Sequence, residues 1–261
     1  MNYDYAALTD TGRMRENNED SVSVDPATGL VVLADGMGGY NAGEVASGMA
    51  TTFITTELGQ WLSQAGEQAL SRDVKRAMEI CVENANTSIF TSAESNAHYS
   101  GMGTTLVVGA FIGSRLILGH IGDSRCYRWR HNTLVPITRD HSLLQEQLDA
   151  GLITPEQAAV SPNRNLVTRA LGVEASVELE VNEFRVEPGD VYLMCSDGLT
   201  DMVSDTAIAT EFSRSEDLET LALNLITIAN AAGGRDNISV LLVNASQSTK
   251  KRGLIDRLLG K

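Results

Sequence analysis

Four aspartates lie at the ends of apolar segments that are far apart in the sequence. Asp35, Asp123 and Asp197 follow such segments, and Asp236 precedes one. A carboxylate at the mouth of a buried strand is costly unless its charge is compensated, and no matching set of basic residues accompanies these four. Oxygen ligands favour a hard cation such as Mg²⁺, Mn²⁺ or Ca²⁺. The alternative is that each aspartate caps a turn or a helix, which is a common role of Asp-Gly.

The elements that must position these residues are mostly strands. Apolar segments bounded by turn residues predict strands over 3–8, 22–24, 30–34, 104–111, 115–121, 124–129, 133–137, 177–186, 190–195 and 238–243. Apolar residues three and four positions apart predict helices over 44–62, 70–90 and 218–232, with a short helix over 142–150. The short connections between 104 and 137 predict an antiparallel meander. Residues 142–176 contain Pro155 and Pro162 and are expected to form a flap.

Composition and charge exclude some functions. The chain has 261 residues, of which 43% are hydrophobic and 21% charged, as is ordinary for a globular protein. Its formal net charge of −14 argues against nucleic-acid binding, which needs a basic surface. We find no repeat or low-complexity linker, so we expect one domain over 1–245, followed by a tail over 246–261.

The tail differs in character from the domain. Its charges give +5 − 1 = +4, and its four large apolar residues fall on one helical face. The basic residues are Lys250, Lys251, Arg252, Arg257 and Lys261, and the apolar ones are Leu254, Ile255, Leu258 and Leu259. Such a segment can bind a membrane surface or a partner. The alternatives are that it docks on its own acidic domain or that it frays.

Cysteine usage and hydropathy bear on the compartment. Three cysteines, Cys81, Cys126 and Cys195, are widely spaced and form no CxxC pair. An odd count without a signal peptide is typical of a reducing cytoplasm. No apolar stretch approaches the roughly 18 residues that span a bilayer. We therefore expect a cytoplasmic protein without a transmembrane segment.

Seven short motifs occur in a specific order. They are GRMRENNED at 12–20, DGMGG at 35–39, GMGTT at 101–105, GDSR at 122–125, NLVTRALG at 165–172, SDGL at 196–199 and RDN at 235–237. In this order the chain resembles the bacterial metal-dependent Ser/Thr protein phosphatases of type 2C, over residues 3–244. The resemblance implies an α+β fold, a four-layer α-β-β-α sandwich in which two packed antiparallel sheets are flanked by helices.

The resemblance also implies a centre of two Mn²⁺ or Mg²⁺ ions. Asp35 would bridge both ions, and the backbone carbonyl of Gly36 would bind one of them. Asp197 and Asp236 would hold the other ion. Asp123, together with Asp197, would form a weaker third site.

Further residues would support this centre. Asp20 and Glu19 would act mostly through metal-bound water, and Asn237, like Glu19, would lie behind the direct ligands. Arg15 matches the arginine that binds the substrate phosphate, since a guanidinium pairs with phosphate in bidentate fashion. The usual histidine candidates for a general acid are replaced by Met37 and Tyr40, so the identity of that acid stays open.

The implied activity is hydrolysis of phosphoserine and phosphothreonine in proteins by a water that bridges the two metals. The enzyme would oppose a Ser/Thr protein kinase and act as a monomer. One alternative is a phosphatase-like regulatory module that binds phosphoproteins without significant turnover. Another is a metal-dependent phosphatase of small molecules. The four histidines show no metal-ligand spacing.

Overall fold

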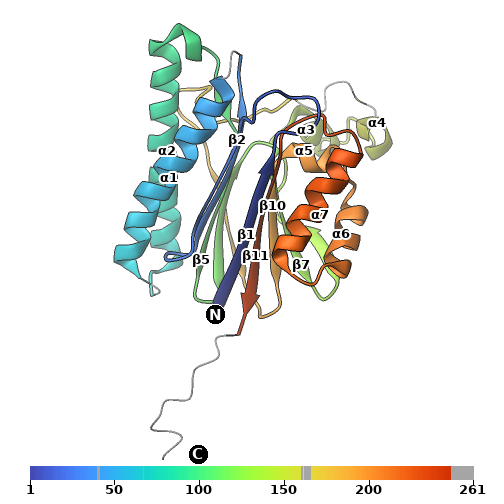
Figure 1. The fold of residues 1–261 in the computed structure, drawn as a ribbon. Helices are drawn as coiled ribbons and strands as arrows, with labels where there is room; N and C mark the ends of the chain where they lie inside the picture. Colours follow the sequence, from blue (N-terminus) through green and yellow to red (C-terminus); the bar gives the residue numbers. More distant parts are fainter. Residues whose placement is uncertain (40–41, 67, 160, 162–165, 248–261) are drawn as a thin grey trace, which may run out of the picture.

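The computed structural model describes residues 1–39, 42–66, 68–159, 161 and 166–247. Two antiparallel sheets pack face to face, with helices on both outer faces (Figure 1). The first sheet has the order β1 (Asn2–Asp10), β11 (Ile238–Ser246), β10 (Val191–Cys195), β7 (Arg125–Arg130) and β8 (Thr133–Pro136). The second has the order β2 (Asp20–Asp25), β3 (Leu30–Met37), β5 (Leu106–Ile112), β6 (Arg115–Ile121) and β9 (Glu180–Arg185), with β4 (Gly103–Thr104) beside β3.

The long helices form the outer layers. Helices α1 (Ala42–Ala65) and α2 (Ser71–Ser95) cover the second sheet, and α6 (Asp205–Arg214) and α7 (Leu218–Ala231) cover the first (Figure 1). Short helices are α3 (Leu143–Asp149), α4 (Pro155–Ala159), α5 (Asp197–Thr200) and the 3₁₀ turn η1 (Ala97–Tyr99). The expected four-layer sandwich is therefore confirmed.

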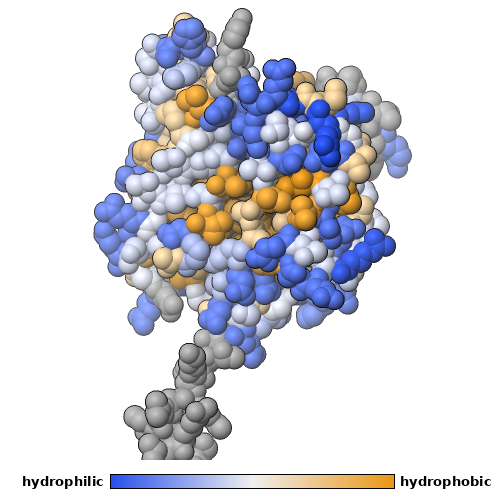
Figure 2. Space-filling view, viewed as in Figure 1, coloured by the Kyte–Doolittle hydropathy of each residue, from blue (hydrophilic) through white to orange (hydrophobic). Residues whose placement is uncertain are grey.

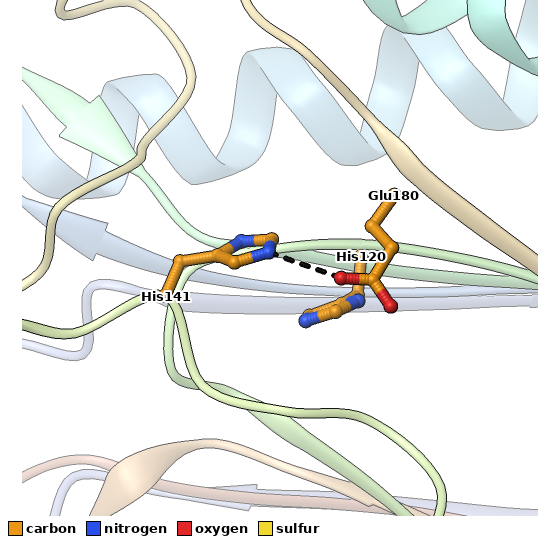
Figure 3. A group of neighbouring side chains, drawn as sticks. All are labelled: His120, His141 and Glu180. Atoms are coloured by element: carbon orange, nitrogen blue, oxygen red, sulfur yellow. Dashed lines mark hydrogen bonds and ion pairs between the residues drawn. The ribbon is translucent and has the colours of Figure 1, made fainter. Parts of the chain in front are cut away.

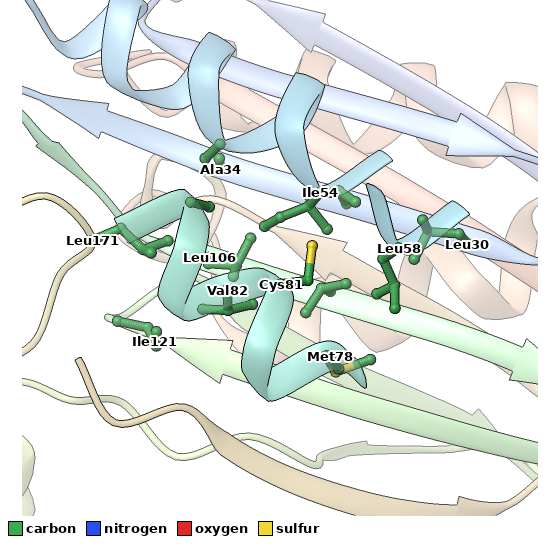
Figure 4. Close-up of a cluster of buried hydrophobic side chains, with 14 of the residues drawn as sticks. Leu30, Ala34, Ile54, Leu58, Met78, Cys81, Val82, Leu106, Ile121 and Leu171 are labelled. Atoms are coloured by element: carbon green, nitrogen blue, oxygen red, sulfur yellow. The ribbon is translucent and has the colours of Figure 1, made fainter. Parts of the chain in front are cut away.

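Three hydrophobic layers hold the sandwich together. Figure 4 shows the layer between the α1–α2 pair and its sheet, to which Ile54, Met78 and Leu106 contribute. A second layer, which includes Phe111 and Tyr192, fills the space between the sheets. A third lies under α6 and α7. Burial of such apolar surface is the main favourable term in folding, and it fixes the strand ends that carry the aspartates.

The expected meander over 104–137 is wrong. Strands β5 and β6 pair in one sheet, whereas β7 and β8 pair in the other. The chain crosses between the sheets at Gly122, whose φ of +99° is a conformation that side chains disfavour. A Cβ at Gly122 would also lie 2.7 Å from the Thr105 side chain. This crossing places Asp123 between the two sheets rather than in a hairpin.

Figure 2 shows hydrophobic side chains at the surface across the middle of one face, bordered by hydrophilic ones.

The remaining sequence expectations concern the cysteines, membrane-spanning helices and the tail. All three cysteines are buried free thiols. Within the described part of the chain, no helix is both long and apolar enough to cross a membrane. Residues 248–261, most of the basic tail, lie outside the described residues.

Candidate active site

Five carboxylates from distant parts of the chain gather between the ends of the two sheets. Asp20 and Asp35 face each other across the β2–β3 ladder. Asp197 follows β10, and Asp236 precedes the neighbouring strand β11. The charges of Asp20, Asp197, Asp123 and Asp236 all raise the pKa of Asp35. The structure thus brings together the aspartates that the sequence singles out.

The electrostatics of this cluster are unfavourable without a cation. Burial, assisted by neighbouring carboxylates, raises the pKa of Asp20 and of Asp123 to about 6. The same two causes raise the pKa of Asp35 and of Asp197 well above the ordinary range. An oxygen-rich, partly buried and negatively charged set of ligands fits a hard divalent cation. The residues present therefore suit Mn²⁺ or Mg²⁺.

The nearby guanidinium groups compensate little of this charge. Arg125 donates to both carboxylate oxygens of Asp140, at 2.8 Å and 2.7 Å, and so pairs outside the cluster. Arg15 donates to Oδ2 of Asp236 at 2.7 Å. The Arg15 side chain is 51% exposed. It therefore lies at the solvent side of the cluster, where a ligand could exchange with this ion pair.

The backbone of Asp35 is held by the two threonines of the GMGTT motif. The Thr104 hydroxyl donates to the Asp35 carbonyl at 2.9 Å, and the Asp35 N–H donates to Thr105 Oγ1 at 3.0 Å. Thr105 Oγ1 also lies 2.7 Å from the hydroxyl of Ser124, next to Asp123. The bonds from Thr104 and Thr105 use only the main chain of Asp35 and fix it in place.

The two Asp-Gly pairs of the site lie in different secondary structure, although both glycines face another segment of main chain. Asp35 and Gly36 lie inside β3, so the turn-cap or helix-cap alternative is wrong for Asp35. A Cβ on Gly36 would collide with the carbonyl oxygen of Gly43 and lie 2.6 Å from that of Glu19. Asp197, by contrast, begins the short helix α5. In both cases the glycine permits a close approach of main chain to main chain.

Asn237 joins the loop of Arg15 to the start of β11. Its Oδ1 accepts the Glu19 N–H at 2.8 Å, and its Nδ2 donates to the carbonyls of Thr11 and Asn17 at 2.9 Å and 2.8 Å. The side chain is buried. Asn237 therefore supports the position of the loop rather than contacting a ligand.

The segment around Arg15 is a turn. The Gly234 carbonyl accepts the N–H groups of Arg13 and Met14, at 2.7 Å and 3.2 Å. The φ of Gly12 is +80°, and the main-chain carbonyl of Asp236 lies against its α-carbon, where a Cβ would collide. The turn thus anchors Arg15 against the Asp236 segment.

A histidine pair beside the Asp123 turn is a feature that the sequence does not reveal. The rings of His120 and His141 stack with centroids 4.4 Å apart and an angle of 15° (Figure 3). His141 Nδ1 accepts the Gly122 N–H at 3.2 Å, and Nε2 lies 3.4 Å from Oε2 of Glu180. His120 Nε2 donates to the Arg139 carbonyl at 2.8 Å.

This group offers three ligand atoms within 4.8 Å of one another. Nearly parallel imidazoles cannot direct their in-plane lone pairs at one ion, however, and two of the nitrogens already bond the backbone. Burial, together with the neighbouring His120, lowers the pKa of His141. We therefore interpret His120, His141 and Glu180 as a structural support for the turn that carries Asp123.

The described geometry accounts for most of the predicted site residues. Asp20, Asp35, Asp123, Asp197 and Asp236 form the cluster, with Arg15 at its mouth. Burial raises the pKa of Glu19. The charges of Arg15 and Asp236 also affect this pKa, which indicates that Glu19 lies beside the cluster. Tyr40 lies outside the described residues.

Comparison with known proteins identifies the family. A profile described as "Protein phosphatase 2C" matches residues 12–224. The serine/threonine phosphatase Stp of Listeria welshimeri is 38% identical over 247 residues, which cover 94% of this chain and 96% of that protein. The serine/threonine protein phosphatase PstP of Mycobacterium tuberculosis is 41% identical over 92% of this chain and 44% of that protein.

Solved structures agree with this result. The crystal structure of the M. tuberculosis phosphatase PstP/Ppp superposes with a TM-score of 0.87 at 38% identity, covering 95% of this chain and all of that one. The catalytic domain of a PstP in complex with two manganese ions has a TM-score of 0.83 at 37% identity, covering 94% of this chain and 99% of that one. With its sandwich, its carboxylate cluster and these matches, the chain belongs to the protein phosphatase 2C family.

Proposed function

We propose that this protein is a protein-serine/threonine phosphatase that hydrolyses phosphoserine and phosphothreonine with the help of two Mn²⁺ or Mg²⁺ ions. The observation that carries the proposal is the cluster of five carboxylates with a half-exposed arginine at its mouth. When bound, two such cations activate water and stabilise charge on the phosphoryl group. The protein then needs no nucleophile of its own. Burial raises the pKa of all three cysteine thiols, which agrees with this chemistry.

Each residue of the cluster has a distinct proposed role. Asp35 would hold both cations, because its carboxylate lies close enough to the other four aspartates for their charges to raise its pKa. The Gly36 carbonyl would bind one cation, and Asp197 with Asp236 would bind the other. The charge of Asp123 raises the pKa of Asp197, and the two carboxylates would share a weaker third site.

The remaining polar residues hold the cluster in place. Asp20 accepts the Ser196 hydroxyl at 2.8 Å, a bond that keeps one carboxylate oxygen oriented. Glu19 and Asn237 support the loop through the bond between them. These residues would act through water or through their neighbours rather than on the phosphate itself.

The proposal is tested by hydrolysis of p-nitrophenyl phosphate with and without Mn²⁺, beside a phosphoserine peptide and small phosphate esters. We expect turnover only with the metal, and a higher kcat/KM for the peptide. An inactive protein that still binds the phosphopeptide would indicate the regulatory module instead. A preference for small esters would indicate a small-molecule phosphatase.

Arg15 provides a specific prediction. Arg15→Ala should lower kcat/KM roughly 10- to 100-fold, since a hydrogen bond to a charged group contributes about 1.5–3 kcal/mol. Arg13→Ala is the matched control, because that side chain lies on the same turn and shows no ion pair among the described residues. The expected change is mainly in KM, measured with the aryl phosphate at saturating Mn²⁺. Equal effects of both substitutions would contradict the proposed grip on phosphate.

The flap contributes a candidate subsite for the substrate peptide. A cavity of about 410 Å³ adjoins Met37, one residue beyond Gly36, and is lined by Val167, Arg169 and Val173. Val173 is 53% exposed and borders this cavity, so its methyl groups are accessible to a peptide side chain. We propose that this cavity receives an apolar residue next to the phosphorylated one.

Val173→Asp tests the subsite. It should lower kcat/KM for a phosphopeptide with a flanking apolar residue about tenfold, equivalent to roughly 1.4 kcal/mol of lost contact. Hydrolysis of p-nitrophenyl phosphate, which has no flanking residue, should not change. Leu223→Asp, another exposed apolar residue (57%) but on α7, is the matched control. Loss of activity toward both substrates would argue for a structural effect only.

The biological setting is also a proposal. Substrates of a Ser/Thr phosphatase must first be phosphorylated, so we propose that the protein opposes a Ser/Thr kinase. The three buried free thiols support a reducing compartment such as the cytoplasm. A monomer is expected, and light scattering at micromolar concentration would measure its mass.

A further inference from the structure

A groove with an apolar floor lies at the end of the sandwich where β11 ends. Its cavity of about 390 Å³ is bounded by β1, β7, β10, β11 and the α6–α7 corner. The floor consists of Trp129, Val191, Phe212, Leu218 and Leu221. The rings of Trp129 and Phe212 pack with centroids 5.3 Å apart. Figure 1 shows that β11 runs towards this end and that α7 begins there.

The rim of this groove is acidic. Four carboxylates, from Asp4, Glu216, Asp217 and Glu219, line it. None of the described residues that line the groove is basic. Asp217 caps α7 by accepting the Thr220 N–H at 2.7 Å, so its charge is fixed at the rim. A groove of this kind fits an amphipathic, basic segment.

We propose that the tail of this chain, residues 248–261, docks in this groove. The tail has a net charge of +4, opposite in sign to the rim, and four large apolar residues on one helical face, which match the floor. The groove is therefore complementary to both the positive charge and the apolar face of the tail.

The chain can reach this groove easily. Asn244 lines the groove itself and precedes Leu254 by ten residues. Ten residues span up to about 33 Å when extended. Because the tether is short, the local concentration of the tail is high, and even weak contacts would hold it in place.

A second cavity near the end of β11 fits the tail less well. It is about 450 Å³ and is lined by Met1, Tyr3, Leu62 and Phe111 among others. Its described lining contains no carboxylate side chain, so it offers nothing to the five basic residues of the tail. Charge complementarity thus favours the groove at α7.

Tryptophan fluorescence tests the proposal in the full chain. The sequence has two tryptophans, and Trp61→Phe leaves only Trp129, on the groove floor. In this background, Leu254→Asp with Leu258→Asp should shift the emission to the red, because the indole becomes exposed to water. A synthetic peptide of residues 248–261, added in trans, should reverse the shift. Unchanged emission in the tail variant would overturn the proposal.

Charge reversal on the rim gives an independent test. Glu216→Lys with Glu219→Lys should cause the same red shift, and adding the tail substitutions should cause no further shift, because the two changes remove one interaction. The matched control is Glu79→Lys with Glu94→Lys, exposed residues on α2, which should leave the emission unchanged. Hydrolysis of p-nitrophenyl phosphate should stay at the wild-type rate in all variants. Additive shifts from rim and tail would contradict the proposal.

Measurements on the same variants would also reveal whether a second copy fills the groove or the tail binds a membrane instead. If a second copy filled the groove, the emission would depend on protein concentration, and light scattering would show a dimer that the tail substitutions dissociate. If the tail instead bound a membrane, the full chain would sediment with vesicles of phosphatidylcholine and phosphatidylglycerol, and the emission without vesicles would not respond to the tail substitutions. Either result would overturn intramolecular docking.

Discussion

Asp35→Asn is expected to lower Mn²⁺-dependent hydrolysis of p-nitrophenyl phosphate at least about 10³-fold, which corresponds to roughly 4 kcal/mol of transition-state stabilisation. The reason is the central position of Asp35, whose carboxylate interacts with four other aspartates. Asparagine keeps the shape but removes the charge and one of the two oxygens. The bonds from Thr104 and Thr105 reach only the main chain of residue 35, so the substitution should leave the strand in place.

Asp25→Asn is the matched control for this experiment. Asp25 lies at the other end of the same β2–β3 hairpin, where it accepts the Ala27 N–H and the Thr28 hydroxyl. An asparagine oxygen can accept one of these bonds, so activity should be close to that of the wild type. Counting bound Mn²⁺ by electron paramagnetic resonance should show two ions in the control and fewer in Asp35→Asn. Retention of a tenth of the activity by Asp35→Asn would refute the bridging role.

Much of the fold follows from local sequence patterns. Strand β6 spans Arg115–Ile121, as predicted from its apolar run, and α7 differs from its predicted range by one residue. Helix α6 is not among the predicted helices, although Ser204 accepts the Ala207 N–H as an N-cap and Asp205 follows it. That capping signal was available in the sequence. The crossing at Gly122 could not be predicted locally, because short connections fit a hairpin and a change of sheet equally well.

The functional site, like the fold, is only partly predictable from the sequence. The strand-end aspartates could be identified from type and position alone, but their convergence depends on the Asp20–Asp35 register and on the packing of two sheets. The family resemblance supplied that information. The stacking of His120 on His141 has no counterpart in sequence spacing, because the two residues come from a strand and from the loop before α3. Only the tertiary structure reveals it.

Without metal ions, the carboxylate cluster should make the protein less stable as pH rises. The pKa of Asp20 and of Asp123 is about 6 in the folded state, against an ordinary 3.8. Between these values the folded protein holds protons that the unfolded chain has released. The free energy of unfolding therefore falls as pH rises from about 4 to 6, by up to about 1.4 kcal/mol per pH unit for each such proton. Asp35 and Asp197 extend this window upward.

Bound metal should reverse this trend, because a cation binds the deprotonated carboxylates of the folded state and stabilises that state by mass action. Tm measured by calorimetry in EDTA and in Mn²⁺ should thus diverge as pH rises from about 5 to 8, by several degrees at pH 8 for a stabilisation of about 2–3 kcal/mol. Asp197→Asn should raise Tm in EDTA, since it removes one repelling charge. It should therefore reduce the difference between Tm in Mn²⁺ and Tm in EDTA. Equal Tm in EDTA and Mn²⁺ at pH 8 would mean that these aspartates bind no metal and only cap turns or helices.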